Sequence, residues 1–162
     1  MNFLLDSKLR AVSTLWENSL FLSAISSFLF AQLIKAVIVL SSSSKTRVRA
    51  AFEALFWRTG GMPSSHAALV SALAASAAIN EGLSSNLFVV TLFLALIVMR
   101  DAMGVRRSAG LQAKTLNIVG TKLAERDDFD YRPVKEVQGH TPLEVVVGCF
   151  LGVIIAAAYA YL

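Results

Sequence analysis

Long apolar runs along the chain predict helices that cross a membrane. The runs 19–40, 84–102 and 142–162 have about the length needed to cross a hydrocarbon core of ~30 Å. A fourth run, 64–80, is rich in alanine and serine, and small residues suit close packing between helices in a bilayer. The pattern therefore predicts an all-α integral membrane bundle of about four transmembrane helices, forming a single domain over 1–162.

Two further segments show amphipathic spacing instead of continuous apolar character. Within 1–18, apolar residues recur at helical intervals, which predicts a helix lying in the membrane interface. The same spacing occurs within 45–58, where basic residues surround the apolar stripe. We therefore expect interfacial helices on both sides of the first span.

The composition agrees with a membrane protein. The chain has 162 residues, of which 56% are hydrophobic, and this is too apolar for an ordinary soluble domain. Its net charge is +4, and the basic residues cluster beside the spans, which points to anionic lipid headgroups and not to nucleic acid. The single Cys149 excludes an intramolecular disulfide. A homo-oligomer stays open.

The distribution of Lys and Arg predicts the orientation of this multi-pass protein. Basic residues are concentrated in 41–62 and 100–140, whereas the turn 80–86 contains neither Lys nor Arg. By the positive-inside rule, the two basic loops are cytoplasmic and the short turn is outside. The second and last spans then begin, and the third span ends, at the same cytoplasmic face.

The segment 60–66 has the features of an anion site at a helix start. Its two glycines permit a tight turn, and Pro63 fits the first turn of a helix. Ser64 or Ser65 can cap that helix. His66 is then held in the first turn, beside free backbone N–H groups and the positive end of the helix dipole. The segment therefore predicts an anion site that carries a proton donor.

A second segment, 139–144, opens the last span. Thr141, Pro142 and Glu144 match the N-cap, N1 and N3 positions of a capping box. One interpretation gives Glu144 this structural role alone. The other is that its carboxylate orients the imidazole of His140, four residues earlier.

The positions of two cations near the same face, Lys35 and Arg58, each have two interpretations. Lys35 lies about one turn from the end of the first span, so its ammonium either reaches the headgroups or enters the site. Arg58 either faces solvent or lipid, or contacts a phosphate. Beyond the third span, Arg107, Lys114 and Asn117 recur at nearly whole helical turns and share one polar face. The acidic loop 125–130 matches no metal-binding pattern, and we expect it to be solvated.

Two histidines with arginines at one membrane face favour phosphoryl transfer through a phosphohistidine. One imidazole attacks phosphorus and the other protonates the leaving alcohol. Arginines and helix N–H groups hold the phosphate oxygens. His140, with Glu144 on the same helix face, suits the attacking role, and His66 suits the acid. The alternative is that both histidines are structural residues at helix starts.

These segments resemble a known superfamily. Pro63, Ser64, Ser65 and His66 are similar to the Pro-Ser-Gly-His motif of type-2 phosphatidic acid phosphatases and vanadium haloperoxidases. The segment 139–144 is similar to their His-x-x-x-Asp motif, with Glu in place of Asp. The wider pattern resembles a divergent branch of that superfamily. Further matching positions are Asp101, Arg106, Arg107, Gln112 and Asn117.

The resemblance implies a helical membrane phosphatase with His140 as nucleophile, Glu144 as its orienting group and His66 as acid. It implies no metal and no cofactor. The Lys-x6-Arg-Pro and Ser-Arg motifs of the superfamily are absent here, so phosphate binding passes to other residues. The candidates are Arg106, Arg107, Ser64, Ser65, Lys35, Arg58 and Lys114. Further polar candidates are Asp101, Gln112 and Asn117.

The leading functional hypothesis is hydrolysis of a lipid phosphate monoester at the cytoplasmic face. Phosphatidylglycerophosphate, phosphatidic acid and polyprenyl phosphates are the candidate substrates. The missing phosphate-binding motifs support an alternative, in which the protein binds or transports a lipid phosphate without cleaving it. A third hypothesis is a structural membrane subunit.

Overall fold

A computed structural model describes residues 14–41, 61–127, 130–137 and 139–161. All regular structure in these ranges is helical, which confirms the all-α prediction. The predicted interfacial helices within 1–18 and 45–58 lie mostly or wholly outside the described residues. The helices are α2 (Ser19–Ser41), α4 (Ser65–Glu81), α5 (Asn86–Met103), α6 (Val105–Asp127) and α7 (Pro142–Tyr161).

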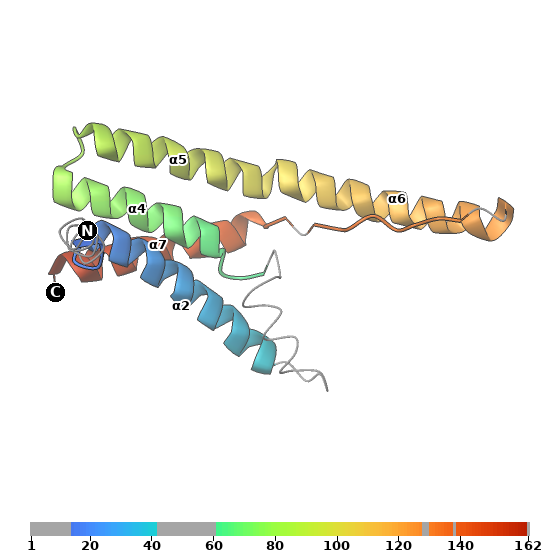
Figure 1. Cartoon of the computed structure of the whole chain (residues 1–162), viewed down its shortest axis with the longest axis horizontal. Coiled ribbons are helices and arrows are strands. Elements are labelled where there is room, and N and C mark those ends of the chain that lie inside the picture. Colours follow the sequence, from blue (N-terminus) through green and yellow to red (C-terminus); the bar gives the residue numbers. More distant parts are fainter. Residues whose placement is uncertain (1–13, 42–60, 128–129, 138, 162) are drawn as a thin grey trace, which may run out of the picture.

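Helix α4 occupies the centre of the bundle and packs against α2, α5 and α7 (Figure 1). It begins where the Ser64 side chain accepts a hydrogen bond from the Ala67 N–H, so Ser64 is the cap among the two candidate serines. It ends at Gly82, whose φ of 85° is readily adopted by glycine. The local sequence therefore sets both ends of the central helix.

Small residues make up the interior of the bundle. A Cβ atom on Gly148 of α7 would overlap the backbone oxygen of Ser64, and one on Gly152 would overlap that of Ala68. The two backbones therefore lie in close contact, as small residues allow in membrane proteins. The most deeply buried side chains are Ala31, Ala68, Ala72, Ala77, Ser23, Ser27 and Ser64.

Large apolar side chains cover the exterior instead. Phe93 and Ile97 on α5, like Phe150 and Ile154 on α7, are about 60% exposed or more. An apolar exterior around a core of small residues suits a helical bundle in lipid. Helix α2, the stretch 86–126 and α7 are long and apolar enough to cross a membrane, and α4 adds a fourth, shorter helix.

Helix α6 continues α5 beyond the bundle, and 130–137 runs back along it (Figure 1). Asn117 connects the two. Its side-chain oxygen accepts hydrogen bonds from the Val134 N–H and the Tyr131 hydroxyl, and its amide donates to the Val134 carbonyl and to Glu136. This connection guides the chain back along α6 to the start of α7.

Substitution of Gly152 by leucine is expected to destabilise the bundle. The new side chain would overlap the backbone of α4, which cannot move aside as a flexible side chain would. Overpacking of this kind costs at least about 1–3 kcal/mol, so the melting temperature in detergent should fall clearly. Val153→Leu, at a position 47% exposed, is the matched control. Equal melting temperatures for both variants would contradict the packing described.

Candidate functional site

Three helix ends meet at one end of the bundle. The His140 N–H donates to the Ala102 carbonyl near the end of α5 at 3.1 Å. The Ser64 N–H donates to the Glu144 carbonyl at 2.9 Å, which joins the start of α4 to the start of α7. Gly139 lies directly against the backbone of Arg107, where a Cβ atom would overlap it. Segments far apart in sequence are thus brought together as the topology predicts.

His140 and Glu144 form a pair at the start of α7. The Nδ1 atom of His140 lies 3.0 Å from Glu144 Oε2. The same carboxylate oxygen accepts the Thr141 N–H at 3.0 Å, and the Thr141 hydroxyl accepts the Glu144 N–H at 3.4 Å. The capping box and the histidine contact therefore coexist. When Nδ1–H donates a hydrogen bond to the carboxylate, Nε2 is unprotonated and keeps its lone pair.

Burial shifts the protonation equilibrium of His140 toward the neutral form. The side chain is buried, and this desolvation lowers the pKa of the imidazole below its ordinary value. The hydrogen bond that His140 donates to Glu144 opposes the shift in pKa, while the positive charges of Lys35 and Arg106 add to it. The net effect favours the neutral imidazole, which is the form that acts as a nucleophile.

Lys35 lies in the interior of the bundle. Its side chain is only 7% exposed, and Nζ lies 3.4 Å from the hydroxyl of Ser65. It is within electrostatic range of Glu144 and His140. The ammonium of Lys35 is therefore next to the start of α4. The hydroxyls of Ser64 and Ser65 both have protein partners.

His66 is exposed at the surface of the bundle. Its ring meets Phe28 edge-on, with centroids 6.1 Å apart, and it is within electrostatic range of Lys35, Arg106 and His140. Arg106 donates from Nε to Asp101 and is half exposed. We call this group the histidine cluster; its members are Lys35, His66, Arg106, His140 and Glu144.

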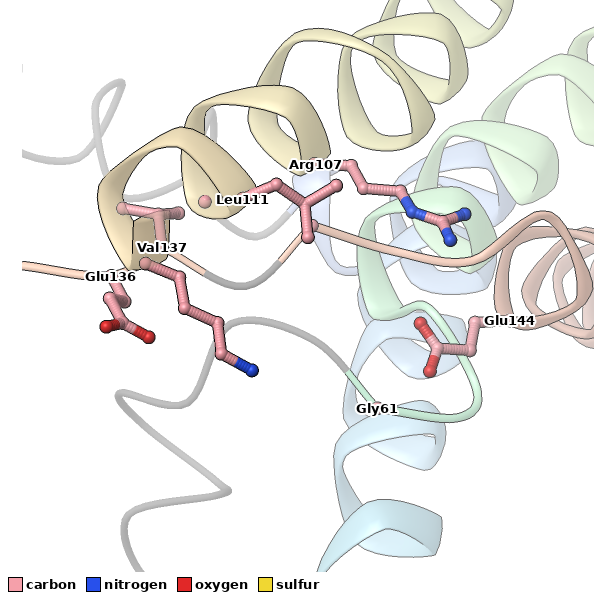
Figure 2. A pocket seen from close by; sticks show the side chains of 9 residues that line it. Gly61, Arg107, Leu111, Glu136, Val137 and Glu144 are labelled. Carbon is pink, nitrogen blue, oxygen red and sulfur yellow. The ribbon is translucent and has the colours of Figure 1, made fainter. Parts of the chain in front are cut away.

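A pocket of about 320 Å³ adjoins the histidine cluster. Figure 2 shows Arg107 and Glu144 at one end of this space, and Glu136 and Val137 at the other. Glu144 belongs both to the pocket and to the cluster, and Gly139 lines the pocket immediately before His140. We call it the α6 pocket; its lining residues are Gly61, Arg107, Gly110, Leu111, Lys114, Glu136, Val137, Gly139 and Glu144.

Comparison with known proteins assigns the family. The model of the divergent PAP2 family matches residues 16–155. The chain belongs to the divergent PAP2 family. It is 38% identical over 151 residues to the uncharacterized membrane protein YuiD of Bacillus subtilis (strain 168), covering 86% of this chain and 92% of the relative. No solved structure matches. The matched region of this divergent PAP2 protein contains the whole histidine cluster.

The remaining candidates of this divergent PAP2 protein lie in different places. Asn117 lies outside the histidine cluster and holds the returning segment 130–137 against α6. Gln112 is exposed and does not line the α6 pocket. Arg58 lies outside the described residues. Sequence reasoning missed Glu136 and Val137, because only the contact of the returning segment with α6 brings them to the pocket.

Proposed function

We propose that this protein hydrolyses a lipid phosphate monoester through a phosphohistidine on His140. The observation that carries the proposal is the hydrogen bond between buried His140 Nδ1 and Glu144 Oε2. This contact supports a neutral imidazole with its Nε2 lone pair available for attack. As the imidazole becomes positively charged in the reaction, the Glu144 carboxylate stabilises it.

In the first step, Nε2 of His140 attacks phosphorus and the bond to the lipid oxygen breaks. His66 gives its proton to the leaving alkoxide. In the second step, water attacks the phosphohistidine, His66 takes a proton from that water, and inorganic phosphate leaves as His140 is regenerated. Lys35 and Arg106 stabilise the negative charge on the phosphoryl oxygens during both steps.

The surroundings of His66 support a lipid as the leaving group. His66 is exposed and touches Phe28 on α2, so an alcohol attached to acyl or prenyl chains can approach it from the side of the bundle. The positive-inside rule supports a cytoplasmic position for this face. Phosphatidylglycerophosphate, phosphatidic acid and polyprenyl phosphate are the substrates to compare. The mechanism needs neither a metal nor a cofactor.

The proposal is tested by measuring phosphate release from these three lipids with purified protein in detergent micelles. We expect hydrolysis of at least one lipid and inhibition by vanadate, which imitates the five-coordinate phosphorus of the transition state. Saturable lipid binding without any phosphate release would instead support the non-catalytic binding or transport function.

The rate is expected to depend on pH through His140. Protonation of Nε2 removes the attacking lone pair, so kcat/KM should fall as pH drops through the pKa of His140. Because burial lowers that pKa, the loss should begin below the ordinary histidine value of 6.5. The unfolded chain binds a proton on His140 more readily than the folded protein does. The free energy of unfolding should therefore also decrease as the pH falls below about 6.5. Profiles of kcat/KM and of melting temperature between pH 4.5 and 8 check both.

A further inference from the structure

The α6 pocket contains two cations that the proposed mechanism does not use. Arg107 and Lys114 are seven residues apart, about two helical turns, and both line the pocket from α6. Within the part of the chain that the structure describes, neither side chain has a hydrogen bond or an ion pair. Their donors are therefore available to a ligand in the pocket.

The carboxylates of the same pocket are already engaged with the protein. Glu136 Oε1 accepts the Asn117 amide at 2.9 Å, and Glu144 Oε2 accepts bonds from His140 and Thr141. The negative groups are thus directed at protein donors, while the positive groups have no such partner among the described residues. This arrangement favours an anionic ligand with several acceptor oxygens.

Arg106 and Arg107 are neighbours in sequence, but their side chains have different surroundings. Arg106 pairs with Asp101 and is within electrostatic range of both histidines, whereas Arg107 lines the α6 pocket. Gly139 lies against Arg107 and lines the pocket. His140, the proposed nucleophile, is the next residue, so the pocket is adjacent to it. Two cationic sites therefore lie next to one another.

We propose that the α6 pocket is a second phosphate site, distinct from the site of reaction in the histidine cluster. The proposal rests on the proposed function. Its ligand is a phosphate group held by Arg107 and Lys114, in a space of a size typical of small ligands. Two sources supply such a group. One is the second phosphate of a lipid that carries two, such as phosphatidylglycerophosphate, and the other is the inorganic phosphate that the reaction releases.

The test compares Lys114→Gln with Lys122→Gln. Both remove the charge of an exposed lysine on α6, but only Lys114 lines the pocket. Two quantities are measured: the inhibition constant of inorganic phosphate, and the kcat/KM ratio of phosphatidylglycerophosphate to phosphatidic acid. Loss of one charge-assisted contact corresponds to about a tenfold change. In Lys114→Gln, an increased inhibition constant indicates free phosphate as the ligand, and a reduced ratio indicates the two-phosphate lipid.

The proposal is overturned if both quantities are the same in Lys114→Gln, Arg107→Gln and wild type. Its failure is distinguishable from failure of the proposed function. If the wild-type protein releases no phosphate from any lipid, equilibrium binding of inorganic phosphate to the folded protein still tests the pocket. Lys114→Gln should then weaken that binding about tenfold, with Lys122→Gln unchanged. Equal binding by the two variants refutes the site.

Discussion

Replacement of His140 by alanine is expected to lower the rate of phosphate release by at least about 10⁴-fold. The substitution removes the nitrogen that forms the bond to phosphorus, and no other described imidazole has the carboxylate contact that His140 makes with Glu144. The measurement is rapid quenching with lipid labelled in its phosphate. Wild-type protein should carry label that is stable in base and labile in acid, as expected for a phosphohistidine, and His140→Ala should carry none.

His66→Ala provides the matched control, because it removes the proposed acid and leaves the nucleophile in place. With a lipid substrate this variant should also be slow. With p-nitrophenyl phosphate, whose leaving group departs without protonation, His66→Ala should still release p-nitrophenol in a single-turnover burst as the phosphohistidine forms, whereas His140→Ala should release none. Unchanged turnover of the lipid in both variants would refute the mechanism and leave both histidines with structural roles.

Local sequence was sufficient to predict the long apolar helices and the start of α4, but not the end of α6, which runs to Asp127 into the segment expected to be a loop. Continuous apolar runs identify membrane helices without any knowledge of their neighbours. The caps are also local, since Ser64, Gly82 and Thr141 act on backbone groups within a few residues. The meeting of distant segments could be predicted because the positive-inside rule limits how such helices are arranged.

Contacts between elements could not be predicted in this way. Spacing alone did not decide whether Lys35 reaches the headgroups or the interior, because both positions are open to a lysine near a helix end. Packing against α4 decides it. Asn117 matched the polar face of α6, but its partners lie on the returning segment, which has no periodic pattern. For the same reason, Glu136 had no recognisable signal.

The arginine pair illustrates the same limit. The sequence groups Arg106 and Arg107 as candidate phosphate ligands, because both match the divergent branch and the phosphate-binding motifs of the wider superfamily are absent. Successive residues on an α-helix point about 100° apart, so adjacent side chains face different neighbours. In the structure one arginine pairs with Asp101 and the other lines the α6 pocket. The proposed division into a reaction site and a second phosphate site depends on this rotation.

Glu144→Gln is expected to lower kcat by about 10²- to 10⁴-fold with little change in melting temperature. Glutamine at the N3 position still completes a capping box, so the start of α7 should be retained. The negative charge that stabilises the imidazolium of His140 is lost. The substitution therefore separates the two functions that meet on one carboxylate oxygen. Steady-state kinetics and thermal unfolding in the same detergent measure both effects.

Thr141→Ala is the converse variant. It removes the hydroxyl that accepts the Glu144 N–H but leaves the contact between Glu144 and His140. Loss of an N-cap side chain costs about 0.5–2 kcal/mol, so the melting temperature should fall while kcat changes little. If instead Glu144→Gln lowers the melting temperature and leaves kcat intact, Glu144 acts only as a cap. In that case Glu144 does not assist His140 in catalysis, and the non-catalytic binding function becomes the better explanation of the site.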